Sequence, residues 1–187
     1  GVGFIINNQQ IKFDYIYSDP SRRVSNQKVF LLSDCEPNIV AHQDVFLDRA
    51  DQVITKVAPL LDISAALNEL KNVKEIYVVS LLNDCKELLF IQEKGFTGNC
   101  LITAVRIHTE GIQQFSFTQK EESETEVKYE KPQQYLYEPD VAVTKAGAFK
   151  IISKAFDIKK LHQHSHLYTS NEFKSDFLGK IYEITEV

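Results

Sequence analysis

Residues 11–23 read IKFDYIYSDPSRR, and the rest of the chain can be interpreted outward from them. Residues 11–18 alternate bulky and smaller side chains and are rich in tyrosine and isoleucine, which is typical of a β-strand. Pro20 has no amide hydrogen to donate to a ladder, so this strand must end near the Asp19-Pro20 step. The stretch therefore predicts a strand followed by a rigid turn that carries one acid and two arginines.

A second apolar run at residues 52–57 ends at Ala58-Pro59. The intervening residues 24–49 hold a polar loop and a weak helical pattern after Pro37, which together are long enough for a crossover connection. A strand, a crossover and a second strand imply a parallel pair within an α/β sheet.

The next segments extend this sheet. Asp62 can cap a helix whose apolar residues follow at helical spacing, and residues 74–82 are apolar on both faces, as in an interior strand. Asn83-Asp84 predicts a short turn, after which residues 85–92 return as a strand antiparallel to the previous one. The sequence thus predicts a mostly parallel sheet that finishes in an antiparallel strand.

The C-terminal part has a different pattern. Two strands are expected at residues 100–108 and 112–118, and the acidic stretch 119–134 has almost no apolar content, which favours an exposed edge or a linker. Beyond this boundary, Asp140 can cap a helix to about Phe156, and alternation at residues 161–169 and 180–185 indicates further strands. Residues 135–187 therefore predict a small α+β module.

Composition narrows the class of protein. The formal net charge is -5, no run of basic residues suggests a nucleic-acid arm, and residues 135–187 are balanced in charge. Three widely spaced cysteines fit a reducing compartment, and no signal peptide or membrane-spanning segment is evident, so we expect a cytoplasmic protein that does not bind a membrane. The chain begins at Gly1 and contains no methionine, which favours a processed or truncated chain.

The most suggestive candidate site is Asp19-Pro20-Ser21-Arg22-Arg23. In open α/β sheets, ligands bind at the carboxyl ends of parallel strands, and paired arginines can hold phosphate or carboxylate. Lys56 ends the neighbouring strand, so it should lie on the same rim as Asp19. The alternatives are a plain turn with solvated arginines and a solubilising lysine.

His162, His164 and His166 would share one face if residues 161–169 form a strand. Two of them could bind a transition metal, but no acidic or cysteine ligand lies at a supporting spacing, so no metal is expected. Lys86, Glu87 and the acidic stretch are expected to be solvated, and the sequence contains no glycine-rich phosphate loop or nucleophile elbow.

Several blocks, in order along the chain, resemble one known family. They are DYIYSDPSRR at 14–23, KVAPLLDI at 56–63, VVS at 78–80, DCKELL at 84–89, YEPD at 137–140, KAGA at 145–148 and SHLYTS at 165–170. The family is the bacterial class I S-adenosylmethionine-dependent methyltransferases that end in a ferredoxin-like segment and a THUMP-like domain.

The resemblance implies a layout and a site. Residues 1–94 would be the second half of a Rossmann-like methyltransferase domain, 95–134 the ferredoxin-like segment and linker, and 135–187 the THUMP-like α+β domain. The acid-Pro motif of such enzymes faces the methyl donor and the target atom, which implies catalytic roles for Asp19, Pro20, Ser21 and Arg22, with Lys56 beside them. THUMP domains are associated with RNA, so the resemblance implies a tRNA or rRNA substrate, with Arg22 and Arg23 contacting phosphate.

One departure from the family limits this interpretation. Its main cofactor-binding loop would precede Gly1, so S-adenosylmethionine is expected in the parent enzyme, and this chain alone should neither bind it appreciably nor transfer methyl groups. Two alternatives stay open: a non-catalytic RNA-binding or adaptor module descended from a methyltransferase, and a structural or interaction domain. The oligomeric state and the methylated atom are left open.

Overall fold

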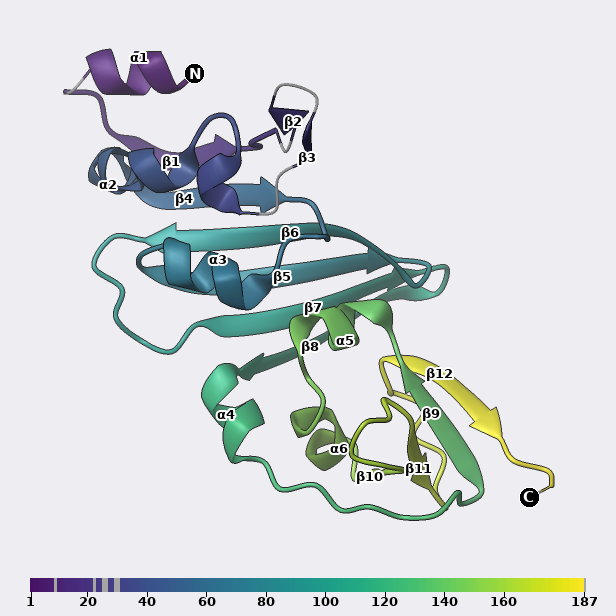
Figure 1. The fold of residues 1–187 in the computed structure, drawn as a ribbon. Helices are drawn as coiled ribbons and strands as arrows, with labels where there is room; N and C mark the ends of the chain where they lie inside the picture. The colour runs from purple at the N-terminus through teal and green to yellow at the C-terminus, as the bar shows by residue number, and fades with distance from the viewer. Residues whose placement is uncertain (9, 22, 25–26, 29–30, 187) are drawn as a thin grey trace. The chain divides into compact units, whose positions relative to one another are not determined.

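The structure, a computed structural model, describes the chain except residues 9, 22, 25–26, 29–30 and 187 (Figure 1). One mixed sheet has six strands in the order β1-β4-β6-β5-β7-β8, and a second sheet has four in the order β10-β11-β9-β12. Contacts divide the chain into two compact units, Gly1–Tyr77 with Lys86–Cys100 and Val78–Cys85 with Leu101–Val187. The α/β class that the sequence predicts is confirmed.

In the first unit, a crossover that contains a helix connects two paired strands. Its elements are α1 (Val2–Asn7), β1 (Phe13–Ser18), β2 (Arg23–Val24), β3 (Gln27–Lys28), the 3-10 helix η1 (Leu32–Asp34), α2 (Ile39–Arg49), β4 (Ala50–Val57), α3 (Ile63–Glu69), the first part of β5 (Val73–Leu81) and most of β6 (Asp84–Glu93).

Strands β1 and β4 pair in parallel, with Ser18 opposite Thr55, and β6 pairs antiparallel to β4, with Lys56 opposite Leu89. The parallel pair confirms the sequence-based expectation, whereas the sequence predicted β6 as the antiparallel partner of the strand before it and did not predict its position beside β4. The crossover helix α2 begins at Asn38, whose side chain accepts a hydrogen bond from Ala41 N. Asp62 caps α3 in the same way, through Ala65 N at 2.7 Å.

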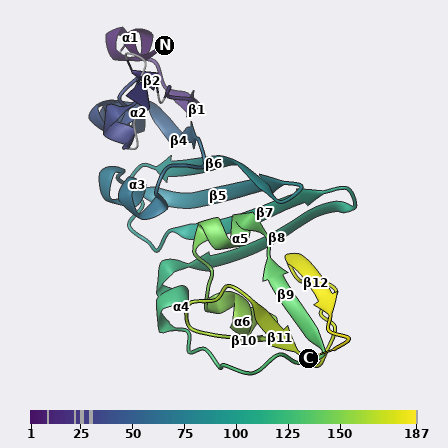
Figure 2. The same ribbon diagram turned by 45° about the vertical axis from the view of Figure 1, so that its right-hand side comes forward.

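Helix α2 covers one face of this part of the sheet, as Figures 1 and 2 show. Gln43 of α2 is buried, and its carboxamide oxygen accepts hydrogen bonds from Lys71 N at 2.8 Å and from Gln92 of β6 at 3.2 Å. This buried polar bridge lies within an apolar core built by Ile16, Leu32, Ile39, Phe46, Val53, Val57, Leu88 and Phe90.

The second unit joins a hairpin to the four-stranded sheet. Its elements are the end of β5, β7 (Leu101–His108), β8 (Gly111–Thr118), α4 (Gln119–Glu124), β9 (Tyr135–Pro139), α5 (Val141–Ala146), α6 (Ile151–Ala155), β10 (Lys159–Lys160), β11 (Tyr168–Ser170) and β12 (Gly179–Glu183). Phe177 stands edge-on to both Tyr137 and Phe156, so a cluster of aromatic side chains lies in the core of this unit.

The acidic stretch 119–134 departs from the expectation of an edge or linker, because it opens with α4. Thr118 and Glu121 form a reciprocal capping box at the start of this helix. Glu122 is not simply solvated, since its carboxylate accepts hydrogen bonds from the amides of Phe149, Lys150 and Ile151 at the start of α6. Helix α4 is therefore fixed to α6 by the Glu122 carboxylate and by Lys150, whose Nζ donates to Ser123 O at 2.9 Å.

Two further expectations for the C-terminal part are wrong. The single helix from Asp140 to Phe156 is instead two helices, α5 and α6, because Gly147 has a φ of 85° and ends α5 in the left-handed conformation. The expected strand at residues 161–169 is a loop as far as Leu167, and only Tyr168–Ser170 form strand β11. Among the described residues, no helix is long and apolar enough to cross a membrane.

Replacing Glu122 with alanine should lower the free energy of unfolding by about 2 kcal/mol, because three amides at the start of α6 lose a charged acceptor. Urea unfolding followed by circular dichroism measures the change. Glu124→Ala is the matched control, since Glu124 is exposed and forms an ion pair with Lys120 at 3.9 Å. Equal effects of the two substitutions would contradict this role of Glu122.

Candidate functional site

The ends of β1 and β4 place Asp19 beside Lys56. Ser18 is opposite Thr55 in the parallel register, so the next residue of each strand emerges on the same rim of the sheet. The Lys56 Nζ and Asp19 Oδ2 atoms lie 2.8 Å apart, with 28% and 52% of the two side chains exposed. The expected proximity of Asp19 and Lys56 is therefore confirmed, whereas their catalytic roles stay predictions.

A second carboxylate, that of Glu87 on β6, completes this group. Its Oε1 lies 3.8 Å from Lys56 Nζ, so the ammonium stands between two acids. Sequence reasoning assigned Glu87 no role, because the antiparallel register of β6 against β4 is needed to bring it there. We call Asp19, Lys56 and Glu87 the rim cluster.

The rim cluster fixes the protonation state of its lysine. The hydrogen bond to Asp19 raises the pKa of Lys56, and the charge of Glu87 adds to this effect while partial burial opposes it. The side chain therefore stays an ammonium at neutral pH. It can donate a hydrogen bond to an oxygen, but it cannot act as a general base.

The turn after β1 is held in place by backbone hydrogen bonds. Pro20 is buried, and Ser21 exchanges two hydrogen bonds with Glu36, from Ser21 N to Glu36 O at 2.8 Å and from Glu36 N to Ser21 O at 3.1 Å. Arg22 lies outside the described residues. Arg23 begins β2, opposite Lys28 of β3, so the backbone position of only one of the two predicted phosphate-binding arginines is described.

A cavity of about 450 Å³ opens beside Asp19. Its polar side comes from residues 17–19 at the end of β1, and its apolar side comes from Pro37, Phe46 and helix α1, including Val2 and Ile5. A partly apolar recess at the carboxyl end of a parallel strand is a common position for a small-molecule site in an α/β sheet.

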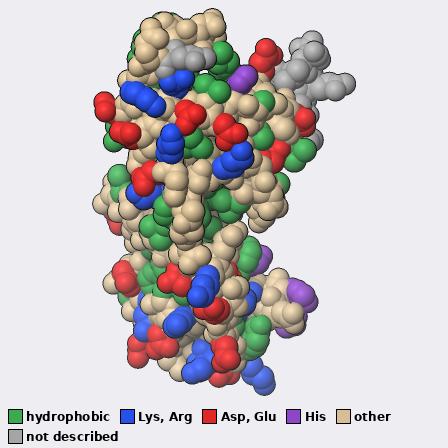
Figure 3. Space-filling model, turned by 90° about the vertical axis from the view of Figure 1, so that its left-hand side faces the viewer, with side chains coloured by type: hydrophobic (Ala, Val, Ile, Leu, Met, Phe, Trp, Pro, Cys, Tyr) green, Lys and Arg blue, Asp and Glu red, His purple; other side chains and the backbone are tan. Residues whose placement is uncertain are grey.

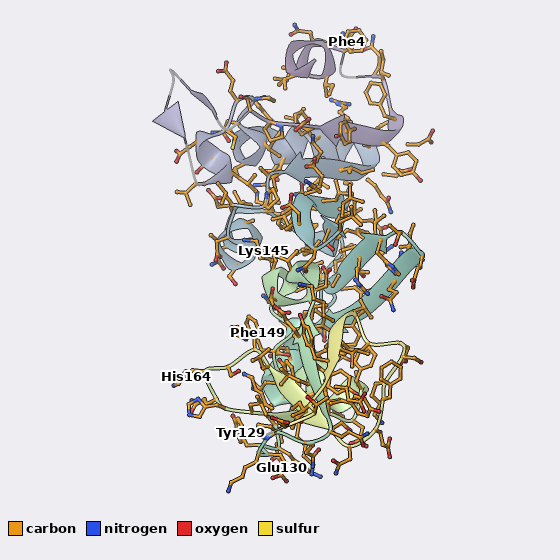
Figure 4. The ribbon with its side chains drawn as sticks, turned by 90° about the vertical axis from the view of Figure 1, so that its right-hand side faces the viewer. Phe4, Tyr129, Glu130, Lys145, Phe149 and His164 are labelled. Carbon is orange, nitrogen blue, oxygen red and sulfur yellow. The ribbon has the colours of Figure 1, made fainter. Side chains whose placement is uncertain are left out.

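The three histidines do not share a strand face, because residues 161–167 form a loop. The rings of His162 and His164 have centroids 5.6 Å apart, whereas His166 stacks on Phe149 at 4.5 Å. Figure 4 shows His164 projecting from this loop, away from the body of its unit. Within the described residues, no group of three potential metal ligands is present.

The second unit contains a buried ion pair that the sequence did not reveal. Asp140 caps α5, as expected, but its carboxylate also accepts a hydrogen bond from Ser80 Oγ at 2.5 Å and lies 3.5 Å from Arg106 Nε. Arg106 in turn donates to Gln113 at 2.7 Å. Asp140, Arg106 and Gln113 border a cavity of about 780 Å³, and the contacts of Arg106 with the other two account for its position without a ligand.

Charges of both signs are mixed on one face of the molecule. On the face that Figure 3 shows, basic and acidic side chains alternate without a large basic area. This agrees with the formal net charge of -5. This face therefore provides no long-range field that would attract a polyanion.

Comparison with known proteins gives a structural likeness and a domain. A candidate methyltransferase of Porphyromonas gingivalis W83 has a crystal structure similar to this chain, with a TM-score of 0.90 and 32% sequence identity. The match covers 98% of this chain and 46% of the other, so the chain spans about half the length of that protein. The chain thus has the fold of part of a methyltransferase-like protein.

A family described as a ferredoxin-like domain matches residues 135–177. These residues lie in the range for which the sequence analysis expected a THUMP-like domain, whereas it placed the ferredoxin-like segment at 95–134. Strands β9, β10 and β11 and helices α5 and α6 lie within the matched residues, whereas β12, the fourth strand of the same sheet, follows them. The curated proteins contain no match to the chain.

Replacing Lys56 with methionine should change the free energy of unfolding by less than about 1 kcal/mol, because its ion pairs are partly exposed and screened by solvent. Lys71→Met is the matched control, since Lys71 lies between α3 and β5 and forms an exposed pair with Asp44 at 2.8 Å. Thermal unfolding of both variants measures the difference. A much larger loss for Lys56→Met would show that the rim cluster is mainly a structural element.

Proposed function

We propose that this chain is part of an S-adenosylmethionine-dependent methyltransferase that modifies RNA. The observation that carries the proposal is the contact between Asp19 and Lys56, at the carboxyl ends of two parallel strands, in a chain whose fold matches part of a methyltransferase-like protein. The RNA substrate is supported by the family resemblance of the C-terminal residues, and tRNA and rRNA are the candidates.

The described residues form only one side of a site for S-adenosylmethionine. Residues 17–19 and the neighbouring apolar side chains border the 450 Å³ cavity, but none of the seven glycines in the sequence forms a glycine-rich turn between a strand and a helix. Backbone amides at such a turn are the usual means of binding the polar parts of a nucleotide-like cofactor. The residues present therefore do not fit the whole cofactor.

The rim cluster can position the molecule that accepts the methyl group without itself forming or breaking a covalent bond. The Lys56 ammonium can donate a hydrogen bond to an oxygen of the acceptor, and Asp19 can accept one from an amino group. Pro20 and the Ser21–Glu36 bonds would keep these groups in place. Holding two reacting atoms in alignment lowers the activation free energy substantially, because the entropy lost in bringing them together is no longer part of the barrier. Positioning is thus the role that we propose for Asp19, Pro20, Ser21 and Lys56, with Arg22 and Arg23 contacting phosphate.

The 187-residue chain should not bind S-adenosylmethionine at micromolar concentration, because it supplies one side of the site. Isothermal titration calorimetry measures this binding directly, at a protein concentration of about 100 μM, which suits weak ligands. Heat of binding with micromolar affinity would overturn the expectation. A longer product of the same reading frame that does bind the cofactor serves as the positive control.

In that longer product, Asp19→Asn and Lys56→Met should each lower methyl transfer by roughly 10- to 100-fold, since they remove one positioning contact. The assay follows transfer of a labelled methyl group to total RNA, and treatment of the acceptor with ribonuclease or protease identifies its class. Asp44→Asn and Lys71→Met, which alter an exposed pair elsewhere in the first unit, are the controls. Label that resists ribonuclease and disappears with protease would replace RNA by a protein substrate.

A further inference from the structure

In the second unit, the outer edge of β8 has no strand beside it. β8 is the last strand of the six-stranded sheet, and β7 is its ladder partner among the described residues. The ladder runs without a bulge from the pair of His108 and Gly111 to the pair of Leu101 and Thr118. β8 therefore presents a regular edge of 8 residues.

Alternate residues of β8 direct their backbone groups to this edge. The carbonyl oxygen of Ile107 accepts a hydrogen bond from Leu82 N at 2.9 Å, so the backbone groups of Ile107 point away from β8. Its partner Ile112 must then point away from β7, as must Gln114 and Ser116, which follow at the strand period of two. Within the described part of the chain, no hydrogen bond engages the backbone of these three residues.

β8 lacks the features that normally prevent an exposed edge from pairing. Such edges usually carry a charged residue, a proline or a bulge. The sequence of β8 is GIQQFSFT, which contains neither a charge nor a proline. The other terminal strands of the six- and four-stranded sheets each hold a charged residue, namely Asp14 in β1, Lys159 in β10 and Lys180 in β12. Among these described terminal strands, β8 is thus the one whose composition permits further pairing.

An exposed aliphatic surface adjoins this edge. Ile112 and Leu82 are each 64% exposed, and Ile107 links them, since it pairs with Ile112 and accepts a hydrogen bond from Leu82 N. Leu82 also has a φ of 51°, in the left-handed region that a bulky side chain seldom adopts. Backbone strain of this kind tends to be kept where it serves a function. A strand added to β8 would cover part of this aliphatic surface.

The β8 strand of a second molecule fits this edge. A twofold axis at Gln114 makes two β8 strands antiparallel, with Gln114 opposite itself and Ile112 opposite Ser116 of the second molecule. Each of these pairs joins backbone groups that point outward. No like charges meet, because β8 carries none, and the Gln114 amide can bond to its own copy because it both donates and accepts.

Charges at the two ends of β8 favour the same arrangement. Glu110 precedes the strand and Lys120 follows it, and both are exposed. Antiparallel pairing lays the start of one strand against the end of the other, so Glu110 of each molecule approaches Lys120 of the second. The neighbouring Glu121 and Glu122 are already engaged, by the capping box and by the amides of α6.

We propose that two copies of the polypeptide associate through the outer edges of their β8 strands, so that their sheets join into one. This interface lies in the second unit, whereas the rim cluster lies in the first. The inference goes beyond the proposed function and does not depend on methyl transfer.

Opposite charges at Gln114 test the pairing. Sedimentation equilibrium of the product of the complete reading frame should give twice the mass of one chain. Gln114→Lys and Gln114→Glu place like charges at the twofold axis, so each should weaken the dimer by at least about tenfold, and an equimolar mixture of the two should restore it. Gln163→Lys is the matched control, since Gln163 is exposed in a loop of the same unit and its replacement should leave the dimer unchanged.

Three results would overturn the proposal. A monomer at a concentration of about 100 μM would show that β8 does not pair with its own copy. A dimer that withstands both substitutions would place the interface on another surface. A mixture of the two variants that stays monomeric would show that Gln114 does not lie opposite itself.

Hydrogen exchange of single amides gives a second measurement on the unaltered protein. The amides of Ile112, Gln114 and Ser116 should exchange at least about tenfold more slowly in concentrated than in dilute solution. Those of Gln113 and Phe115, which point toward β7, should exchange at the same rate in both. Outward amides that are protected at every dilution would show that another segment of the same polypeptide covers the edge, which would also overturn the proposal.

Discussion

Parallel pairing of β1 with β4 is the constraint on which the rest of the first unit depends. Because the two strands run in the same direction, the chain must cross over between them, and α2 fills this connection and buries one face of the sheet. The same pairing makes both strands end on one rim, which brings Asp19 to Lys56. The core and the candidate site are thus two results of one choice of strand direction.

Local pattern was enough to predict most of this sheet. The end of β1 at Asp19-Pro20, the capping of α3 by Asp62 and the antiparallel return of β6 follow from proline chemistry, side-chain hydrogen bonding and turn length, each of which acts within a few residues. The prediction of one helix from Asp140 to Phe156 was wrong for a reason that is also local. Apolar spacing continues through Gly147, but that glycine adopts a left-handed conformation in which the helix stops.

The candidate site was predictable in part. Asp19 and Lys56 could be paired because they follow strands whose parallel arrangement the sequence indicates. Glu87 could not, since its approach to Lys56 depends on the register of β6 against β4. Glu122 shows the same limit, because the amides that it accepts from lie 27 to 29 residues away. Contacts between distant segments are fixed by tertiary packing, which composition and spacing do not encode.

The charges of the rim cluster have a consequence for what can approach it. Two carboxylates and one ammonium leave a formal excess of one negative charge at the end of β1 and β4. Such a group attracts a positively charged species and repels a phosphate at close range, although solvent screens both effects. The rim cluster is therefore electrostatically selective for cations, and a polyanion that reaches it must have its nearest phosphates neutralised by other side chains.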